Sequence, residues 1–271
     1  MAHDHEDTVA SRIKKELARV AIATMCALIF WAPGNASAAD IGPLPVKKPA
    51  PPFKTYSTVL FGGFDDRSRS YYGYGGIIYA FNRNLAADGF LFRAMGLYNV
   101  YDYDSTAVVG GKVDGRMSAF DVLLGYQKNL PSANLVARLF AGLDYESHDL
   151  SPSNPFDTNE GTAYGVHVRG ELETPYISPY HLSLLASYGS AKRRYWVRGR
   201  AGYNFQGIIL GPEGVVTGNR ETKEQRVGAF VTFRHPALVP FELSISGGYS
   251  HTEDTRGGAS GYGTIELSVA L

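Results

Sequence analysis

The chain of 271 residues has one cysteine, Cys26, and no apolar run of the roughly 20 residues that a membrane-spanning helix needs. A single thiol cannot close an intramolecular disulfide, which excludes a disulfide-stapled secreted domain. The chain also has no excess of either charge, because 26 basic and 26 acidic residues give a net charge of +0. This balance gives no reason to expect a nucleic-acid partner.

The first 38 residues differ from all that follow. Basic residues lie between positions 12 and 19, an apolar run fills 20–32, and Ala36-Ser37-Ala38 is a small-x-small sequence. This order is typical of a secretory signal peptide, so 1–38 is predicted to be removed before Ala39. The alternative, an anchor helix, has too short an apolar run. Residues 39–55 are rich in proline and are predicted to form an extended periplasmic lead-in.

Residues 161–188 contain the clearest strand pattern. Tyr164, Val166 and Val168 alternate with His167 and Arg169, and the alternation stops at the prolines of 175–179 before it resumes. Successive side chains of a strand point to opposite faces, so the pattern predicts a β-hairpin with one apolar face and one charged face.

The same pattern continues through 56–271. The predicted strands are 56–64, 70–81, 89–102, 113–127, 134–147, 160–173, 180–189, 193–204, 206–217, 223–234, 240–252 and 261–271. Compact turns alternate with longer, more polar connections such as 104–112 and 148–160, as in outer-membrane barrels. The chain is therefore predicted to be all-β, an antiparallel transmembrane β-barrel of roughly twelve strands (ten to fourteen) in the outer membrane of a Gram-negative bacterium. A periplasmic or secreted β-sandwich is the alternative.

Charged residues at mid-strand positions are predicted to face the inside of the barrel. They are Arg93, Asp121, Arg138, Asp144, Glu146, Arg169, Glu171, Arg198, Arg200, Glu213, Arg226, Glu242 and Glu266. Gly211-Pro212-Glu213-Gly214 is the least ordinary strand segment, because proline removes a ladder donor and implies a bulge or a local opening. The candidate site is a lumenal charge cluster of Arg198, Arg200, Glu213, Arg226, Arg169, Glu171 and His167. It is either a set of structural ion pairs or a ligand-contacting lumen.

Several short motifs resemble those of the BcsS family, whose members are found with bacterial cellulose-synthesis genes. The motifs are VLFGGF at 59–64, YGYGG at 72–76, DGFLFR at 88–93, GPEG at 211–214, QRVGA at 225–229 and GYG at 261–263. The resemblance implies an outer-membrane protein accessory to cellulose production or export, with cellulose or components of the cellulose-synthase complex as partners. It carries no catalytic residues. Lipid and lipopolysaccharide are the expected surroundings of the barrel.

Other functions have weaker support in the sequence. Some small barrels hydrolyse lipids with a Ser/His pair, and His167 and His181 face inward near Ser183 and Ser187, but no motif joins a serine to a histidine. Asp102, Asp104 and Asp114 could hold a cation, but solvated loop acids explain them better. The glycines of 73–76 precede no helix, as a phosphate loop would require. The chain is therefore expected to be non-catalytic, with no cofactor or metal, and a small-solute diffusion channel remains the alternative function.

Overall fold

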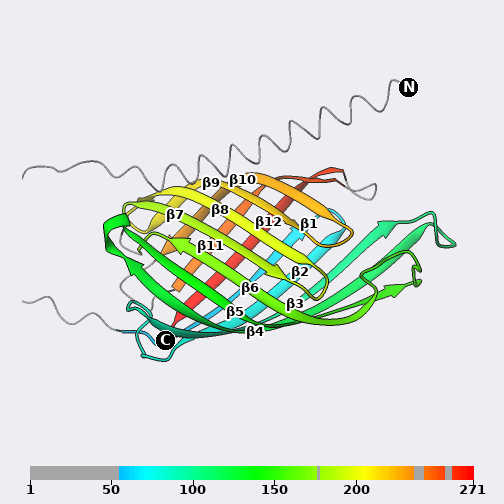
Figure 1. Cartoon of the computed structure of the whole chain (residues 1–271). Coiled ribbons are helices and arrows are strands. Elements are labelled where there is room, and N and C mark those ends of the chain that lie inside the picture. The colour runs from blue at the N-terminus through cyan, green and yellow to red at the C-terminus, as the bar shows by residue number, and fades with distance from the viewer. Residues whose placement is uncertain (1–54, 176–177, 235–240, 254–257) are drawn as a thin grey trace, which may run out of the picture. The chain divides into compact units, whose positions relative to one another are not determined.

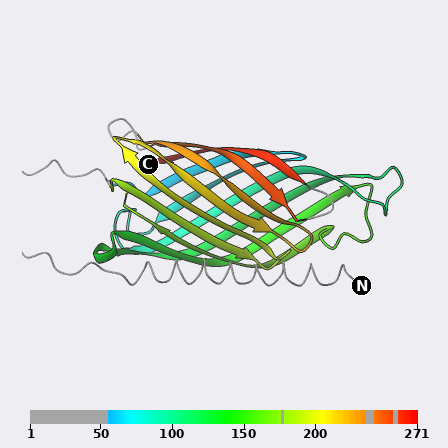
Figure 2. The same ribbon diagram turned by 90° about the horizontal axis from the view of Figure 1, so that it is seen from above.

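The computed structural model describes residues 55–175, 178–234, 241–253 and 258–271. The predicted signal peptide, 1–38, and nearly all of the predicted lead-in lie outside this part of the chain. The described residues form twelve antiparallel strands that close into a barrel in the order β1-β12-β11-β10-β9-β8-β7-β6-β5-β4-β3-β2, as Figures 1 and 2 show. A closed sheet is not a sandwich, so the alternative fold is wrong.

The strands follow the chain in sequence order, with one 3-10 turn, η1 (Pro131–Ala133), between β4 and β5. They are β1 (Thr58–Arg67), β2 (Ser70–Ala80), β3 (Gly89–Asp104), β4 (Lys112–Leu130), β5 (Leu135–Ser151), β6 (Gly161–Glu173), β7 (Tyr180–Gly189), β8 (Arg194–Phe205), β9 (Ile208–Gly218), β10 (Lys223–Arg234), β11 (Phe241–Thr252) and β12 (Ala259–Ala270). No helix in the described part of the chain is long and apolar enough to cross a membrane.

Closure depends on the first and last strands. β1 pairs with β12 from Val59↔Ala270 to Arg67↔Tyr262, and the amide of Leu271 donates to the carbonyl of Thr58 at 2.8 Å. The sheet therefore has no free edge, which satisfies the backbone groups that an open sheet would leave unpaired.

Three strands continue three or four residues past their predicted ends. β1 continues to Arg67, β4 to Leu130 and β5 to Ser151, so the assignment of 65–67 to a loop is wrong; the other strand ends differ from the prediction by at most two residues. The physical reason is the polar lumen. Asp65 is 0% exposed inside the barrel, where a charged residue belongs to a strand rather than ending it.

The two faces of the sheet have opposite character. Large apolar side chains point outward, for example Leu143 at 73% and Leu139 at 68% exposure, whereas Arg93 and Glu146 are buried at 1% and 0%. The thirteen mid-strand charges assigned to the inner face are all buried or half-buried. The interior is thus packed with polar side chains, and the largest apolar cluster is small: Ala80, Leu91, Leu123 and Phe140.

The ladder is interrupted beside Pro212, as the missing donor of proline implies, but there is no bulge and the two strands stay close together. The β8–β9 ladder pairs Arg200↔Glu213 and then Tyr203↔Leu210, with the intervening pairs missing and the register unchanged. No residue is inserted, because β9 also pairs continuously with β10 through Ala229↔Pro212.

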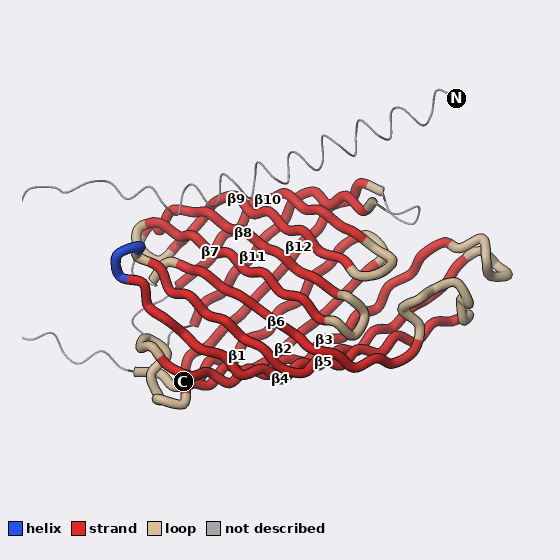
Figure 3. Tube along the Cα trace, in the orientation of Figure 1, coloured by secondary structure: helices blue, strands red, loops and turns tan. Residues whose placement is uncertain are grey.

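The rims differ as predicted. β3, β4 and β5 extend beyond their neighbours at the rim that carries the longer loops, as the tube in Figure 3 shows. There the β5–β6 connection is held from two sides. Tyr103 on β3 donates to Asp157 at 2.7 Å, and the amide of Thr158 donates to Glu221, between β9 and β10, at 3.2 Å. Because β3 and β9 lie on opposite sides of the barrel order, this connection crosses the mouth.

Candidate functional site in the barrel lumen

Glu213 is positioned by the strand order. β9 lies between β8 and β10, and Arg200 stands directly opposite Glu213 in the β8–β9 register. The two side chains, 7% and 2% exposed, form an ion pair through Arg200 Nε, and Tyr262 donates to the other carboxylate oxygen at 3.1 Å. The predicted pairing of Glu213 with a neighbouring arginine is therefore present, and the partner is Arg200.

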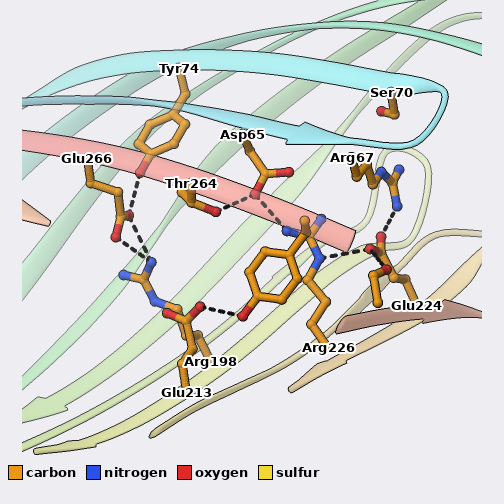
Figure 4. Close-up of polar contacts among 12 residues, drawn as sticks. Asp65, Arg67, Ser70, Tyr74, Arg198, Glu213, Glu224, Arg226, Thr264 and Glu266 are labelled. Atoms are coloured by element: carbon orange, nitrogen blue, oxygen red, sulfur yellow. Dashed lines mark hydrogen bonds and ion pairs between the residues drawn. The ribbon is translucent and has the colours of Figure 1, made fainter. Parts of the chain in front are cut away.

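Glu266 joins opposite parts of the wall. Arg198 Nη1 donates to both of its oxygens at 2.8 Å, and Arg200 Nη2 lies 2.8 Å from Oε2. Tyr74 on β2 also donates to Glu266, at 2.5 Å (Figure 4). Three strands separate β8 from β12, so these contacts cross the lumen instead of following the sheet.

Arg226 belongs to a separate network. It donates to Asp65 at 2.6 Å and to Glu224 at 2.8 Å, and Glu224 also pairs with Arg67 (Figure 4). Thr264 donates to Asp65 at 2.7 Å. Arg226 is thus not a partner of Glu213, because two closer carboxylates already hold it.

Sequence reasoning missed Asp65, Arg67 and Glu224 as members of the lumenal networks. The first two were assigned to a loop. Glu224 lies at the start of a strand, where a charged residue is common and does not indicate which face it occupies. The alternation of side chains along β1 could have identified the first two: Asp65 and Arg67 alternate with the outward-facing Phe64 and Asp66, which assigns them to the inner face.

The remaining predicted residues lie on β6. Arg169 donates to Glu171 at 2.6 Å, and Arg138 approaches the same carboxylate at 3.4 Å. His167 lies 3.7 Å from Asp121, which accepts a hydrogen bond of 2.6 Å from Arg93. These contacts form a second group, without a direct link to Glu213.

Residues of all three sets, around Glu213 and Glu266, around Arg226 and on β6, line one cavity of about 350 Å³ inside the barrel. Six of the seven predicted residues contribute to its wall; Glu171 does not. The wall also has an aromatic side, which the sequence reasoning did not assign to the lumen. Trp196 and Tyr72 pack edge to face with ring centroids 6.1 Å apart, and the Arg226 guanidinium lies 5.5 Å from the centre of the Trp196 ring.

Comparison with known protein families matches residues 59–271 to the family described as "Cellulose biosynthesis protein BcsS". The chain belongs to this family. The matched region contains every strand from β2 to β12, nearly all of β1 and the whole wall of the cavity. The resemblance noted in the sequence motifs is thereby confirmed, and the family name places this BcsS-family barrel in cellulose biosynthesis. No curated protein matches the chain.

Several solved structures share the barrel architecture. The KdgM porin in complex with disordered oligogalacturonate has 10% identity and a TM-score of 0.43, over 79% of this chain and 99% of that one. The β domain of the Bordetella autotransporter BrkA has 10% identity and a TM-score of 0.46, over 80% and 100%. LpxR from Salmonella typhimurium has 13% identity and a TM-score of 0.45, over 79% and 100%.

The contacts in this BcsS-family barrel give little support to a Ser/His hydrolase or to a cation site. His167 and His181 form no hydrogen bond with Ser183 or Ser187. Asp102 and Asp104 each accept a hydrogen bond of 2.7 Å from Arg69, which takes the place a cation would occupy. The described residues contain no group of three potential metal ligands.

Proposed function

We propose that this BcsS-family protein is an outer-membrane β-barrel that supports the assembly or export of cellulose without catalysing a reaction. The observation that carries the proposal is that apolar side chains lie on the outside of the barrel and charged side chains on the inside, the reverse of a water-soluble protein. Apolar side chains such as Leu143, Leu139 and Tyr164 cover the outside, at 73%, 68% and 79% exposure, while ion pairs fill the inside. A water-soluble protein rarely exposes so continuous an apolar surface, whereas a lipid-facing barrel requires one.

The outer face and the rims suggest different partners. The apolar belt suits membrane lipid and lipopolysaccharide. The extended β3–β5 rim, with its bridged β5–β6 connection, is the part available to cellulose or to components of the cellulose-synthase complex. Export through the inner membrane would use the N-terminal segment 1–38 as a cleaved signal peptide, and the mature chain would begin at Ala39.

A small-solute diffusion channel is the second candidate, favoured by the lumenal cavity. Against it stand the ion pairs that cross the lumen, because Arg198, Arg200 and Glu266 occupy space that a pore would leave to water. Paired charges of both signs also give no selectivity for one ion. An accessory role therefore explains the lumen better.

Gene deletion in a cellulose-producing bacterium tests the proposal. Cell-associated cellulose should fall and should return when the gene is supplied again, and the protein should sediment with outer membranes and begin at Ala39. Unchanged cellulose would contradict the accessory role. Recovery in the soluble periplasmic fraction would contradict the membrane location.

A further inference from the structure

The lumenal cavity has the features of a binding site. We propose that it binds a short neutral oligosaccharide, such as a β-linked glucan of a few residues; the choice of sugar rests on the proposed function in cellulose biosynthesis. Its volume of about 350 Å³ lies within the range of roughly 300–1,000 Å³ of small-molecule sites. Its wall combines aromatic rings, arginines that are ion-paired within the barrel and unfilled hydrogen-bonding atoms, and each points to the same class of ligand.

The aromatic side of the wall is held in place before any ligand arrives. Tyr72 packs against Trp196 and lies 6.2 Å from Tyr74, centroid to centroid, and Tyr74 is fixed by its hydrogen bond to Glu266. The faces of aromatic rings carry partial negative charge, and the C–H groups of a pyranose ring carry partial positive charge, so the two surfaces attract. Rings that are already ordered lose little conformational freedom on binding.

The charges of the wall favour a neutral ligand over an anion. Seven arginines line the cavity, and each of them has a carboxylate partner in the barrel: Arg67, Arg93, Arg169, Arg194, Arg198, Arg200 and Arg226. An anion would have to compete with these carboxylates. A sugar hydroxyl both donates and accepts, so it can bond to the guanidinium and the carboxylate of one pair without changing the charge of the site.

Unfilled hydrogen-bonding atoms of both kinds border the cavity. His167, 4% exposed, is part of the wall, and neither of its ring nitrogens has a hydrogen-bond partner. The Nε donors of Arg67 and Arg93, also in the wall, are without one. So is the Oδ2 acceptor of Asp121, which lies 3.7 Å from His167 but is not part of the wall. Buried polar groups are normally satisfied, so such a set marks a place where another molecule completes the bonding. A polyol supplies donors and acceptors together, whereas an anion supplies acceptors alone.

The cavity extends to one rim of the barrel. Gly218, Asn219 and Thr222, at the β9–β10 turn, belong to its lining. This is the rim of the longer loops, where the β5–β6 connection contacts Glu221. An oligosaccharide that enters from this rim would pass beside the β5–β6 connection and lie along the aromatic side, with its hydroxyl groups towards the β6 group of His167 and Arg169.

Tryptophan fluorescence makes the site directly observable. The chain has two tryptophans, Trp31 and Trp196, and Trp196 lines the cavity. The protein carrying Trp31→Phe, so that Trp196 is its one tryptophan whether or not 1–38 is removed, would be purified in detergent and titrated with cellotetraose, with fluorescence and calorimetry recorded together. We expect saturable binding by both methods, with a change in Trp196 emission, and much weaker binding of tetragalacturonate, an anionic sugar of the same length.

Two variants and a control assign the binding to the cavity. Trp196→Ala removes one stacking face, and Ser187→Phe, directly opposite Trp196 in the β7–β8 register, fills the space instead. Each should weaken cellotetraose binding by about tenfold or more, read by calorimetry. Tyr98→Phe, on the outer face at 50% exposure, should bind as the unsubstituted protein does. The heat-dependent shift in gel mobility of a folded barrel identifies the variants that fold.

The outcomes test the binding site independently of the proposed role in cellulose production. Absence of saturable binding to the folded protein, or unchanged affinity in folded Trp196→Ala and Ser187→Phe, would overturn the site. Tighter binding of tetragalacturonate would overturn the choice of a neutral ligand. None of these results touches the accessory role, which is decided by cellulose production in the deletion strain.

Discussion

At the scale of single residues, burial decides how much an ion pair of the lumen contributes. In the Arg200–Glu213 pair both side chains are buried, at 7% and 2% exposure, whereas in the Arg234–Glu242 pair, 2.5 Å apart, Arg234 is 8% and Glu242 31% exposed. Removing one partner of a fully buried pair leaves the other charged and unsolvated, at a cost of roughly 3–5 kcal/mol. Pairs that water reaches contribute about 0–1 kcal/mol.

Glu213→Gln should therefore lower the free energy of unfolding by less than the roughly 3–5 kcal/mol of a lone buried charge, because Glu266 still pairs with Arg200, but by more than Glu242→Gln, whose carboxylate water already reaches. The measurement is reversible urea unfolding in lipid vesicles. A double variant that also neutralises Arg200 should recover part of the loss, because no lone charge is then left buried at Glu213. Equal losses for the two glutamates would mean that the lumen solvates both pairs alike.

Asp88, in the turn between β2 and β3, allows a pH prediction outside the membrane-spanning strands. A hydrogen bond from Lys128, followed by one of 2.7 Å from the Asn129 amide, lowers the pKa of Asp88 from 3.8 to about 2. The carboxylate form thus stabilises the folded state above pH 3.8, and this contribution is lost as the pH falls towards 2.

In the folded barrel, the Asn129 amide resonance should therefore titrate with a midpoint near 2. Lys128→Ala should move that midpoint upward, since it removes the largest cause of the shift. A midpoint already near 3.8 in the unsubstituted protein would show that the turn does not hold these bonds in solution.

At the scale of strands, β9 contains a close approach that follows from the gap in its ladder. A Cβ added at Gly211 would lie 1.9 Å from the carbonyl oxygen of Ala201, whereas one at Gly214 would meet nothing within 4 Å. Since the obstructing atom is backbone, β8 and β9 would have to move apart beside Pro212.

Gly211→Ala should therefore destabilise the barrel by about 1–3 kcal/mol, the usual cost of overpacking, and should slow its insertion into vesicles. Gly214→Ala, three residues along the same strand, is the matched control and should stay within about 0.5 kcal/mol. The same unfolding titration measures both. If the two variants are equally stable, the contact between β8 and β9 is looser than described.

Strands are also the scale at which the sequence was most informative. Period-two alternation was sufficient to assign faces and to predict twelve strands, because side-chain direction on a strand is local. It misplaced 65–67, since a run of charges is typical of loops unless the interior is known to be polar. It could not predict that Glu266 bonds Arg198 and Tyr74, because contacts across the lumen depend on closure and register, which no local pattern encodes.

At the scale of the whole molecule, ion pairs that cross the lumen connect strands that are not neighbours in the barrel. Glu266 on β12 joins β8 through Arg198 and Arg200, and Asp65 on β1 joins β10 through Arg226. These links run through the cavity, which residues of eleven of the twelve strands line. A barrel organised in this way can hold a ligand without offering a continuous water-filled path.

The unsubstituted protein should accordingly show little or no current in a planar bilayer. Glu266→Gln removes the carboxylate that Arg198 and Arg200 share; Arg200 keeps Glu213, but Arg198 loses the ion pair that holds it across the lumen. A freed guanidinium in a narrow lumen attracts anions, so this variant should conduct, with selectivity for chloride over potassium. Glu242→Gln, which touches none of these residues, is the control and should stay silent. Large, ohmic steps from the unsubstituted protein would instead favour the diffusion channel, because they would require a path that the paired charges of Arg198, Arg200 and Glu266 do not close.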